Sequence, residues 1–152
     1  MPAELKKGEM NELFGLKVDE PFHIISQMSS ERYVDLVGRN MVIKTRNGLP
    51  SQEWFFDGKT KTIKSMRTKS YSWNIQNSGR TNNMEVYNTN SRWFQLFVWL
   101  KDEGQFWDIH DKRIIEVAGS KDEEGASIAL GKDSNKKSNK WKLVYTKDAK
   151  PI

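Results

Sequence analysis

The chain of 152 residues contains no cysteine, which excludes a disulfide framework and a metal site with thiolate ligands. It has only two histidines, His23 and His110, which are too few for a histidine-rich metal site. No segment approaches the roughly 20 apolar residues that a transmembrane helix needs. Residues 1–18 are charged throughout and lack the apolar run of a signal peptide. From these absences we expect a soluble protein that does not span a membrane and is located in the cytoplasm.

Recognisable chemical motifs are equally scarce. The sequence has no nucleophile with a matched base, no glycine-rich loop of the kind that cradles phosphate, and no residues at metal-ligand spacing. The acidic pair Asp102–Glu103 stands in a segment typical of a solvated loop. We therefore predict that the protein is not an enzyme and holds neither a metal nor a cofactor.

The net charge of +5 leaves room for a negatively charged partner. The lysines, however, are interleaved with Asp, Glu, Asn and Ser, which is typical of a solvated surface. Basic residues between positions 59 and 69 could form a stripe. We expect no nucleic-acid partner, because such binding needs basic residues gathered on one face together with aromatic rings.

A repeat of about 43 residues runs through the sequence. The segments VIKTRNGLPSQEWFF, EVYNTNSRWFQLFVW and ALGKDSNKKSNKWKL align so that their aromatic residues lie 43 and 44 positions apart. The aromatic column holds Trp54, Phe97 and Trp141, an amide column two positions earlier holds Gln52, Gln95 and Asn139, and an apolar column 11 positions earlier holds Ile43, Val86 and Leu130. A period of this length decides the whole architecture.

Each repeat also contains a short segment in which apolar and polar residues alternate, as in a strand with one buried face. These segments are YVDLVG, SWNIQN and IIEVAG, at residues 33–38, 72–77 and 114–119. Their apolar side chains are expected to point inward: Val34 and Leu36, Trp73 and Ile75, Ile115 and Val117. The polar residue between each pair is then expected to face solvent; these are Asp35, Asn74 and Glu116.

These patterns predict an all-β protein, a single β-trefoil of three repeats with pseudo-threefold symmetry. The trefoil is expected over residues 22–148, with repeats near 22–65, 66–107 and 108–148, after an N-terminal arm of residues 1–21. Matched core layers would be formed by Trp54, Phe97 and Trp141, by Ile43, Val86 and Leu130, and by Leu36, Ile75 and Val117. The apolar residues of MNELFGL in the arm could form a short helical turn that docks on the domain or on a partner.

The sequence resembles the ricin B-type lectin family, whose β-trefoil repeats end in a Gln-any-Trp signature. The resemblance covers about residues 22–148 and implies a protein that binds sugars without catalysis, in shallow pockets of which each repeat can form one. The family pocket uses an acidic side chain for sugar hydroxyls, an aromatic ring for the apolar face of the sugar, and an Asn-Gln pair.

Carried over repeat by repeat, the resemblance implies seven ligand-binding candidates: Asp35 and Gln52, then Asn74, Tyr87 and Gln95, and finally Glu116 and Asn139. The ring position holds Lys44 in the first repeat and Gly131 in the third, so only the second repeat keeps a stacking ring. In that repeat Asn74 replaces the acid and Phe94 replaces the Asn of the final pair. We therefore predict a weak, partly degenerate site for a galactose- or GalNAc-type sugar in the second repeat; the alternative is that its residues are relics.

A second function remains open, that of an intracellular adaptor or scaffold that binds protein partners, for example cytoskeletal ones, and has lost its sugars. The second repeat carries surplus aromatic residues, Trp93, Phe94, Trp99 and Trp107. If several of them are exposed together, they would form an apolar patch of the kind that marks a protein contact. The absence of cysteine and of a signal peptide favours this alternative. The sequence carries no signal for an oligomeric state.

Overall fold

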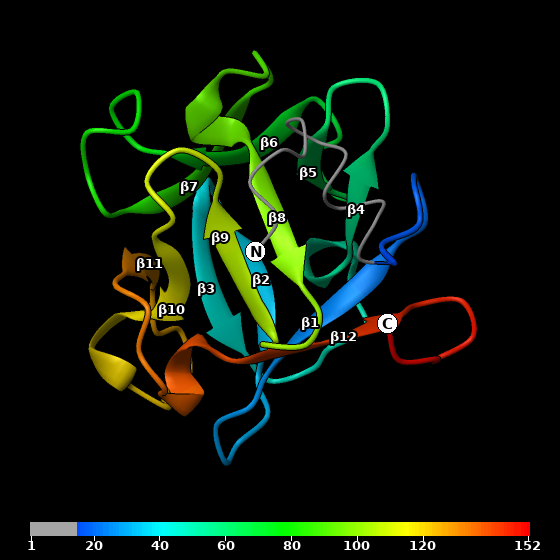
Figure 1. Ribbon diagram of the computed structural model, residues 1–152. Helices are drawn as coiled ribbons and strands as arrows, with labels where there is room; N and C mark the ends of the chain where they lie inside the picture. The colour runs from blue at the N-terminus through cyan, green and yellow to red at the C-terminus, as the bar shows by residue number, and fades with distance from the viewer. Residues whose placement is uncertain (1–14) are drawn as a thin grey trace.

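The described residues, 15–152, form twelve short strands and four single turns of 3-10 helix in a computed structural model (Figure 1). The strands are β1 (Phe22–Ser26), β2 (Tyr33–Val37), β3 (Asn40–Lys44), β4 (Trp54–Asp57), β5 (Thr62–Ser65), β6 (Tyr71–Ile75), β7 (Met84–Asn88), β8 (Phe97–Leu100), β9 (Gln105–Asp108), β10 (Ile114–Val117), β11 (Ile128–Gly131) and β12 (Trp141–Tyr145). The helical turns are η1 (Pro50–Gln52), η2 (Trp93–Gln95), η3 (Ala118–Ser120) and η4 (Lys137–Asn139). Within these residues, no helix is long and apolar enough to cross a membrane.

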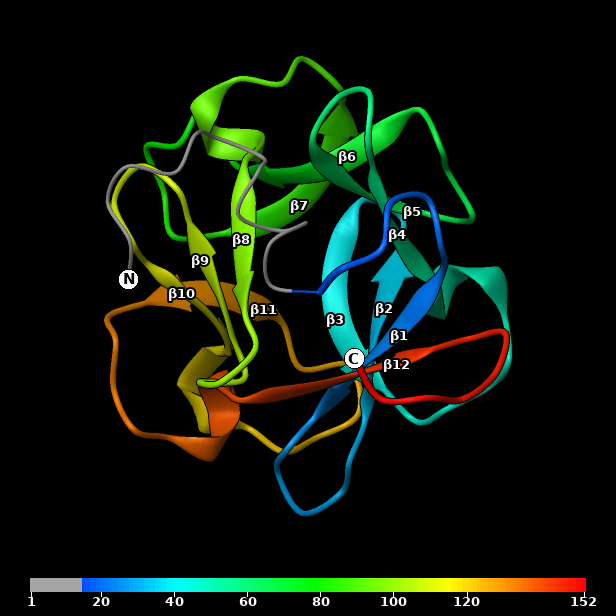
Figure 2. The same cartoon turned by 45° about the vertical axis from the view of Figure 1, so that its right-hand side comes forward.

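The strands pair in an antiparallel manner and form two sheets. Eight of them form a sheet in the order β12-β1-β2-β3-β7-β6-β5-β4, which closes through pairing of β1 with β4, and the other four form a sheet in the order β11-β10-β9-β8. The hairpins β2–β3, β6–β7 and β10–β11 recur at equivalent places. Single bridges, Val42 to Ser127 and Asn83 to Ala129, join these hairpins. Strands β3, β7 and β11 of the three hairpins contact one another (Figure 2). The predicted β-trefoil with pseudo-threefold symmetry is confirmed.

The core includes the layers that the sequence predicts, and all nine of their side chains are buried in one cluster. The indole N–H of Trp54 donates to the carbonyl oxygen of Val34, and that of Trp141 to the carbonyl oxygen of Ile115, each at 3.1 Å. In the second repeat the residue types are exchanged, because Trp73 stands at the position of Val34 and Phe97 at that of Trp54. The two rings of this exchanged pair meet edge to face, with centroids 5.6 Å apart.

One expectation about the strand surface is wrong. The side chains of Asp35 and Asn74 do not face solvent, since each residue is only 3% exposed. Glu116 is partly exposed. Asp35 and Asn74 do lie on the strand face opposite the core, but the loop that ends in the amide column folds over that face and covers them.

The N-terminal arm is described from residue 15 onward, so most of the predicted helical turn, including Met10 and Leu13, lies outside the described residues. Within the described part, Leu16 packs in the main core at 2% exposure. The hydroxyl group of Tyr145 accepts a hydrogen bond from the Lys17 N–H at 3.0 Å and donates one to the Gly15 carbonyl at 3.2 Å. The end of the arm therefore docks on its own domain.

The surplus aromatic residues of the second repeat do not gather on the surface. Phe94 and Trp99 are buried, while Trp93 and Trp107 are partly buried against different neighbours. Trp93 stacks on His110 with ring centroids 4.3 Å apart, whereas Trp107 packs beside a small cluster around β8. These four rings form no exposed apolar patch within the part of the chain that the structure describes.

Candidate functional site

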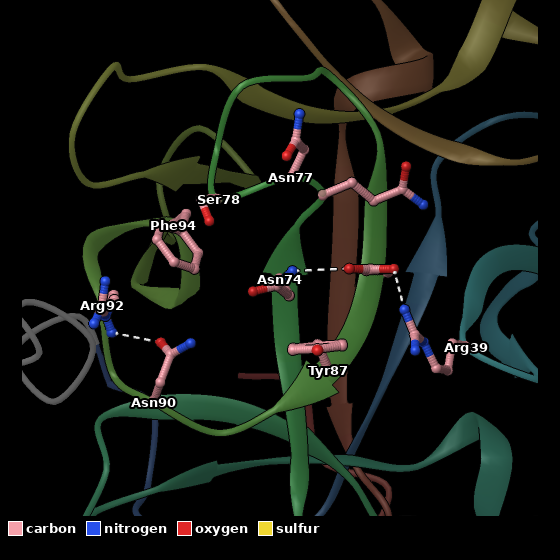
Figure 3. Close-up of a pocket in the computed structure, with 10 residues that line it drawn as sticks. Arg39, Asn74, Asn77, Ser78, Tyr87, Asn90, Arg92 and Phe94 are labelled. Carbon is pink, nitrogen blue, oxygen red and sulfur yellow. Dashed lines mark hydrogen bonds and ion pairs between the residues drawn. The ribbon is translucent and has the colours of Figure 1, made fainter.

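A pocket of about 560 Å³ opens over strands β6 and β7 of the second repeat (Figure 3). The residues that line it are Arg39, Asn74, Gln76, Asn77, Ser78, Glu85, Tyr87, Asn90, Arg92 and Phe94. Two of the three site residues predicted for this repeat, Asn74 and Tyr87, are therefore brought together there. The third, Gln95, lies beneath the pocket wall and is 0% exposed.

Gln95 holds the loop that forms one wall of the pocket. Its side-chain oxygen accepts hydrogen bonds from the backbone N–H groups of Asn90 at 2.8 Å and Ser91 at 3.1 Å. Its amide nitrogen donates to the Asn88 carbonyl at 2.9 Å and to Asn74 Oδ1 at 3.1 Å. All four bonds are internal, so Gln95 shapes the pocket and orients Asn74 without reaching its interior.

The amide column also bonds to loops in the other repeats, where Gln52 and Asn139 are fully buried. Gln52 accepts from the Asn47 N–H at 3.0 Å and donates to the Thr45 carbonyl at 2.9 Å. Asn139 donates to the Ser134 carbonyl at 2.7 Å. The protein itself therefore supplies hydrogen-bond partners for both side chains, which lie behind the loops.

The acidic group of the pocket comes from a residue that the sequence did not point to. Asn74 on β6 is paired directly with Glu85 on β7, and residues opposite each other in an antiparallel pair share a face. Because Gln95 donates to Asn74 Oδ1, the amide nitrogen of Asn74 is free to donate to Glu85 Oε2, at 2.9 Å. The carboxylate that is missing at position 74 is thus present on the adjacent strand.

Arg39, from the turn between β2 and β3, brings the first repeat into the same site. Its guanidinium group donates to Glu85 Oε1 at 3.0 Å, and this hydrogen bond raises the pKa of Arg39. The guanidinium carbon also lies 4.8 Å from the centre of the Tyr87 ring, which is within the range of a cation–π contact. Arg39, Glu85 and Asn74 form a continuous row of hydrogen-bonded side chains beside Tyr87 (Figure 3).

Tyr87 is the aromatic platform of the pocket. It is 40% exposed, which is unusual for a large apolar side chain of this protein, and its ring lies next to Asn74 (Figure 3). An exposed ring beside hydrogen-bonding groups offers both kinds of contact that a sugar makes, stacking on its C–H face and hydrogen bonding to its hydroxyls.

The opposite wall is a strained loop between β6 and β7. Asn77 and Ser78 both adopt a left-handed backbone with φ of 54°, and Gly79 follows with φ of 86°. Trp93 packs so closely against Gly79 that a Cβ atom there would overlap the indole ring. Arg113 from the third repeat donates to the Thr81 carbonyl at 2.8 Å. Both contacts hold the loop in place over the pocket.

The equivalent positions of the other repeats are filled by the protein itself. In the first repeat, Asp35 is only 3% exposed, and its carboxylate accepts from the Leu36 N–H at 2.7 Å and from Gln52 Nε2 at 3.0 Å. In the third, Glu116 lies so close over Gly131 that a Cβ atom there would overlap its carboxylate. Glu116 thus occupies the space in which a stacking ring would stand.

Comparisons with known proteins agree with this architecture. The C-terminal half of an earthworm R-type lectin, solved in complex with GalNAc, superimposes with a TM-score of 0.69 at 15% identity, over 82% of this chain and 97% of that chain. A ricin B-like lectin from Macrolepiota procera, solved with lactose, gives a TM-score of 0.69 at 15% identity, over 84% and 96%. A designed threefold-symmetric protein gives a TM-score of 0.71 at 16% identity, over 83% of this chain and 99% of that chain. The fold is that of a ricin B-type β-trefoil. No protein-family model matches the sequence, and no curated protein is significantly similar to it.

Within this ricin B-type β-trefoil, the loop-holding amide is kept in all three repeats, whereas an open pocket with an exposed ring is built in the second. The second-repeat pocket also differs in its acid, which stands on β7 as Glu85 and is bonded to Arg39 of the first repeat. Comparison of the repeats does not point to Glu85. Its role follows from the strand register, which pairs it with Asn74.

Proposed function

We propose that the chain is a non-enzymatic carbohydrate-binding module and that the sugar occupies the second-repeat pocket. The observation that carries the proposal is the exposed ring of Tyr87 beside the bonded pair of Asn74 and Glu85. The ricin B-type fold supports it, because structures of the same fold were solved with GalNAc and with lactose. We therefore propose a galactose- or GalNAc-type sugar.

The division of roles follows from the chemistry of the side chains. The ring of Tyr87 would stack on the apolar C–H face of the sugar, while Glu85 accepts hydrogen bonds from hydroxyl groups. Asn90 and the Asn77–Ser78 segment supply further polar groups at the rim of the pocket. Binding of this kind makes and breaks no covalent bond.

The affinity should be low, because Glu85 already shares its two oxygens with Arg39 and Asn74. A site with one ring and a partly engaged carboxylate is expected to have a Kd of about 1 mM, which corresponds to about 4 kcal/mol. We expect no avidity from several sites, because the protein's own side chains fill the equivalent positions of the first and third repeats.

The test is a titration of the protein with galactose, GalNAc and lactose, in which tryptophan fluorescence and NMR detect binding. Tyr87→Ala should abolish the response, and Tyr87→Phe should keep most of it because the ring remains. Val37→Ala, which truncates an exposed apolar residue outside this pocket, serves as the control and should bind like the unmodified chain. Unchanged binding by Tyr87→Ala would refute this site.

The alternative is an intracellular adaptor that binds protein partners, such as cytoskeletal ones, without sugar. One observation favours it: a second hollow of about 520 Å³ lies at the junction of the three hairpins, lined in part by Met41, Met84 and the exposed Val37. A flat response to all sugars, together with partner capture from cell extract that Val37→Asp abolishes, would favour the adaptor. We also propose a cytoplasmic location for the protein, which a fluorescent fusion would check.

A further inference from the structure

The second-repeat pocket carries an excess of positive charge. Its ten lining residues include two arginines, Arg39 and Arg92, against a single acid, Glu85. Both oxygens of Glu85 are engaged, one by Arg39 and the other by Asn74. Arg39 therefore balances the charge of Glu85, and no acidic residue that lines the pocket balances the charge of Arg92.

Among the residues that the structure describes, none pairs with the guanidinium group of Arg92. Its backbone N–H donates to Asn90 Oδ1 at 2.9 Å, which fixes the start of η2, but within residues 15–152 its side chain makes no hydrogen bond or ion pair. The residue is exposed and lines the pocket. Figure 3 shows it on the side of Asn74 opposite to Arg39.

Arg39 adds unused donors on the other side. Only one of its nitrogens bonds to Glu85, and its side chain is 50% exposed. A guanidinium group has five N–H donors in a planar fork, which suits the oxygens of a carboxylate or a sulfate. A ligand that spans the pocket over Tyr87 would thus meet N–H donors at both ends.

We propose that the pocket prefers a sugar that bears an anionic group, a carboxylate or a sulfate, over the same sugar without it. Arg92 binds the anionic group, and Tyr87 stacks on the neutral ring next to it. This inference rests on the proposed sugar binding and goes beyond it, because a neutral galactose-type ligand would leave the charge of Arg92 unmatched.

The experiment compares lactose, sialyllactose and sulfated lactose in calorimetric titrations. An added charge-assisted hydrogen bond should make one or both anionic ligands bind about tenfold more tightly than lactose. Raising the salt from about 50 to 300 mM should reduce this preference, since the contact is exposed. A preference for sialyllactose identifies a carboxylate, and one for the sulfated sugar identifies a sulfate.

Two variants with the same loss of charge separate a local contact from the general field of the protein. Arg92→Gln should bring the anionic ligands to the affinity of lactose while the affinity for lactose is unchanged. Arg80→Gln is the matched control, because Arg80 is exposed in the adjacent β6–β7 loop and does not line the pocket. It should keep the preference.

Three results would overturn the inference. Equal affinity for lactose and both anionic ligands refutes the preference and leaves the proposed sugar binding in place. A preference that Arg80→Gln reduces as much as Arg92→Gln refutes the role of Arg92. Absence of binding to all three ligands refutes the inference and the proposed function together.

Discussion

Replacement of Gln95 by alanine removes the side chain that holds the pocket loop. Four hydrogen bonds are lost, and they leave two backbone N–H groups, the Asn88 carbonyl and Asn74 Oδ1 without their partner. A buried polar group left unsatisfied costs about 1–3 kcal/mol. Water can reach part of this loop, so we expect the free energy of unfolding to fall by about 2–4 kcal/mol, less than the sum of the four.

Urea denaturation followed by tryptophan fluorescence measures this change, with the slope of the transition as a check on two-state unfolding. The melting temperature should fall by about 6–12 °C for a domain of this size. Gln27→Ala is the control, since Gln27 is exposed and its side chain donates one hydrogen bond, to the Trp141 carbonyl. A loss below about 1 kcal/mol in Gln95→Ala would show that the loop does not depend on the buried amide.

Two further predictions concern the loop clamp and the response to pH. Gly79→Ala should lower stability by about 2–3 kcal/mol, because its φ of 86° disfavours a side chain and the added methyl group overlaps Trp93; Gly48→Ala, at φ of 73° with open space around it, should cost only about 1 kcal/mol in the same denaturation assay. Burial lowers the pKa of His23, although the nearby charge of Glu53 acts to raise it. As the pH falls, the unfolded chain therefore binds a proton at this residue before the folded chain does, and stability should decrease below about pH 6.5. His23→Gln should remove the contribution of His23 to this decrease in melting curves, and an identical pH profile for His23→Gln would contradict the prediction.

The trefoil was predictable from the sequence because its core repeats. The aromatic column Trp54, Phe97 and Trp141 recurs at nearly constant spacing, and only a closed body with three equivalent units buries all three rings together. Tyr87 and Asn74 could also be predicted from the sequence, since each occupies a column of the repeat. Both indeed line the same pocket.

The remaining features of the pocket depend on contacts between strands and between repeats. Glu85 faces Asn74 because of the hairpin register, and Arg39 arrives from a different repeat. The alternation of β2 and β6 predicted the faces of Asp35 and Asn74 correctly but not their burial, which results from the loops that fold back over them. Such coverage is a tertiary effect that alternation within one strand does not encode.

The exchange of Trp73 and Phe97 makes the three repeats unequal as building blocks. A symmetric protein assembled from three copies of the first repeat would place an aliphatic side chain at every position of Trp73, and its interior would be close to the arrangement around Trp54. Three copies of the second repeat would instead place an indole ring at all three of these positions. The interior is therefore built around one repeat that differs from the other two, and Trp73 of that repeat meets the rings of Trp54, Phe97 and Phe106.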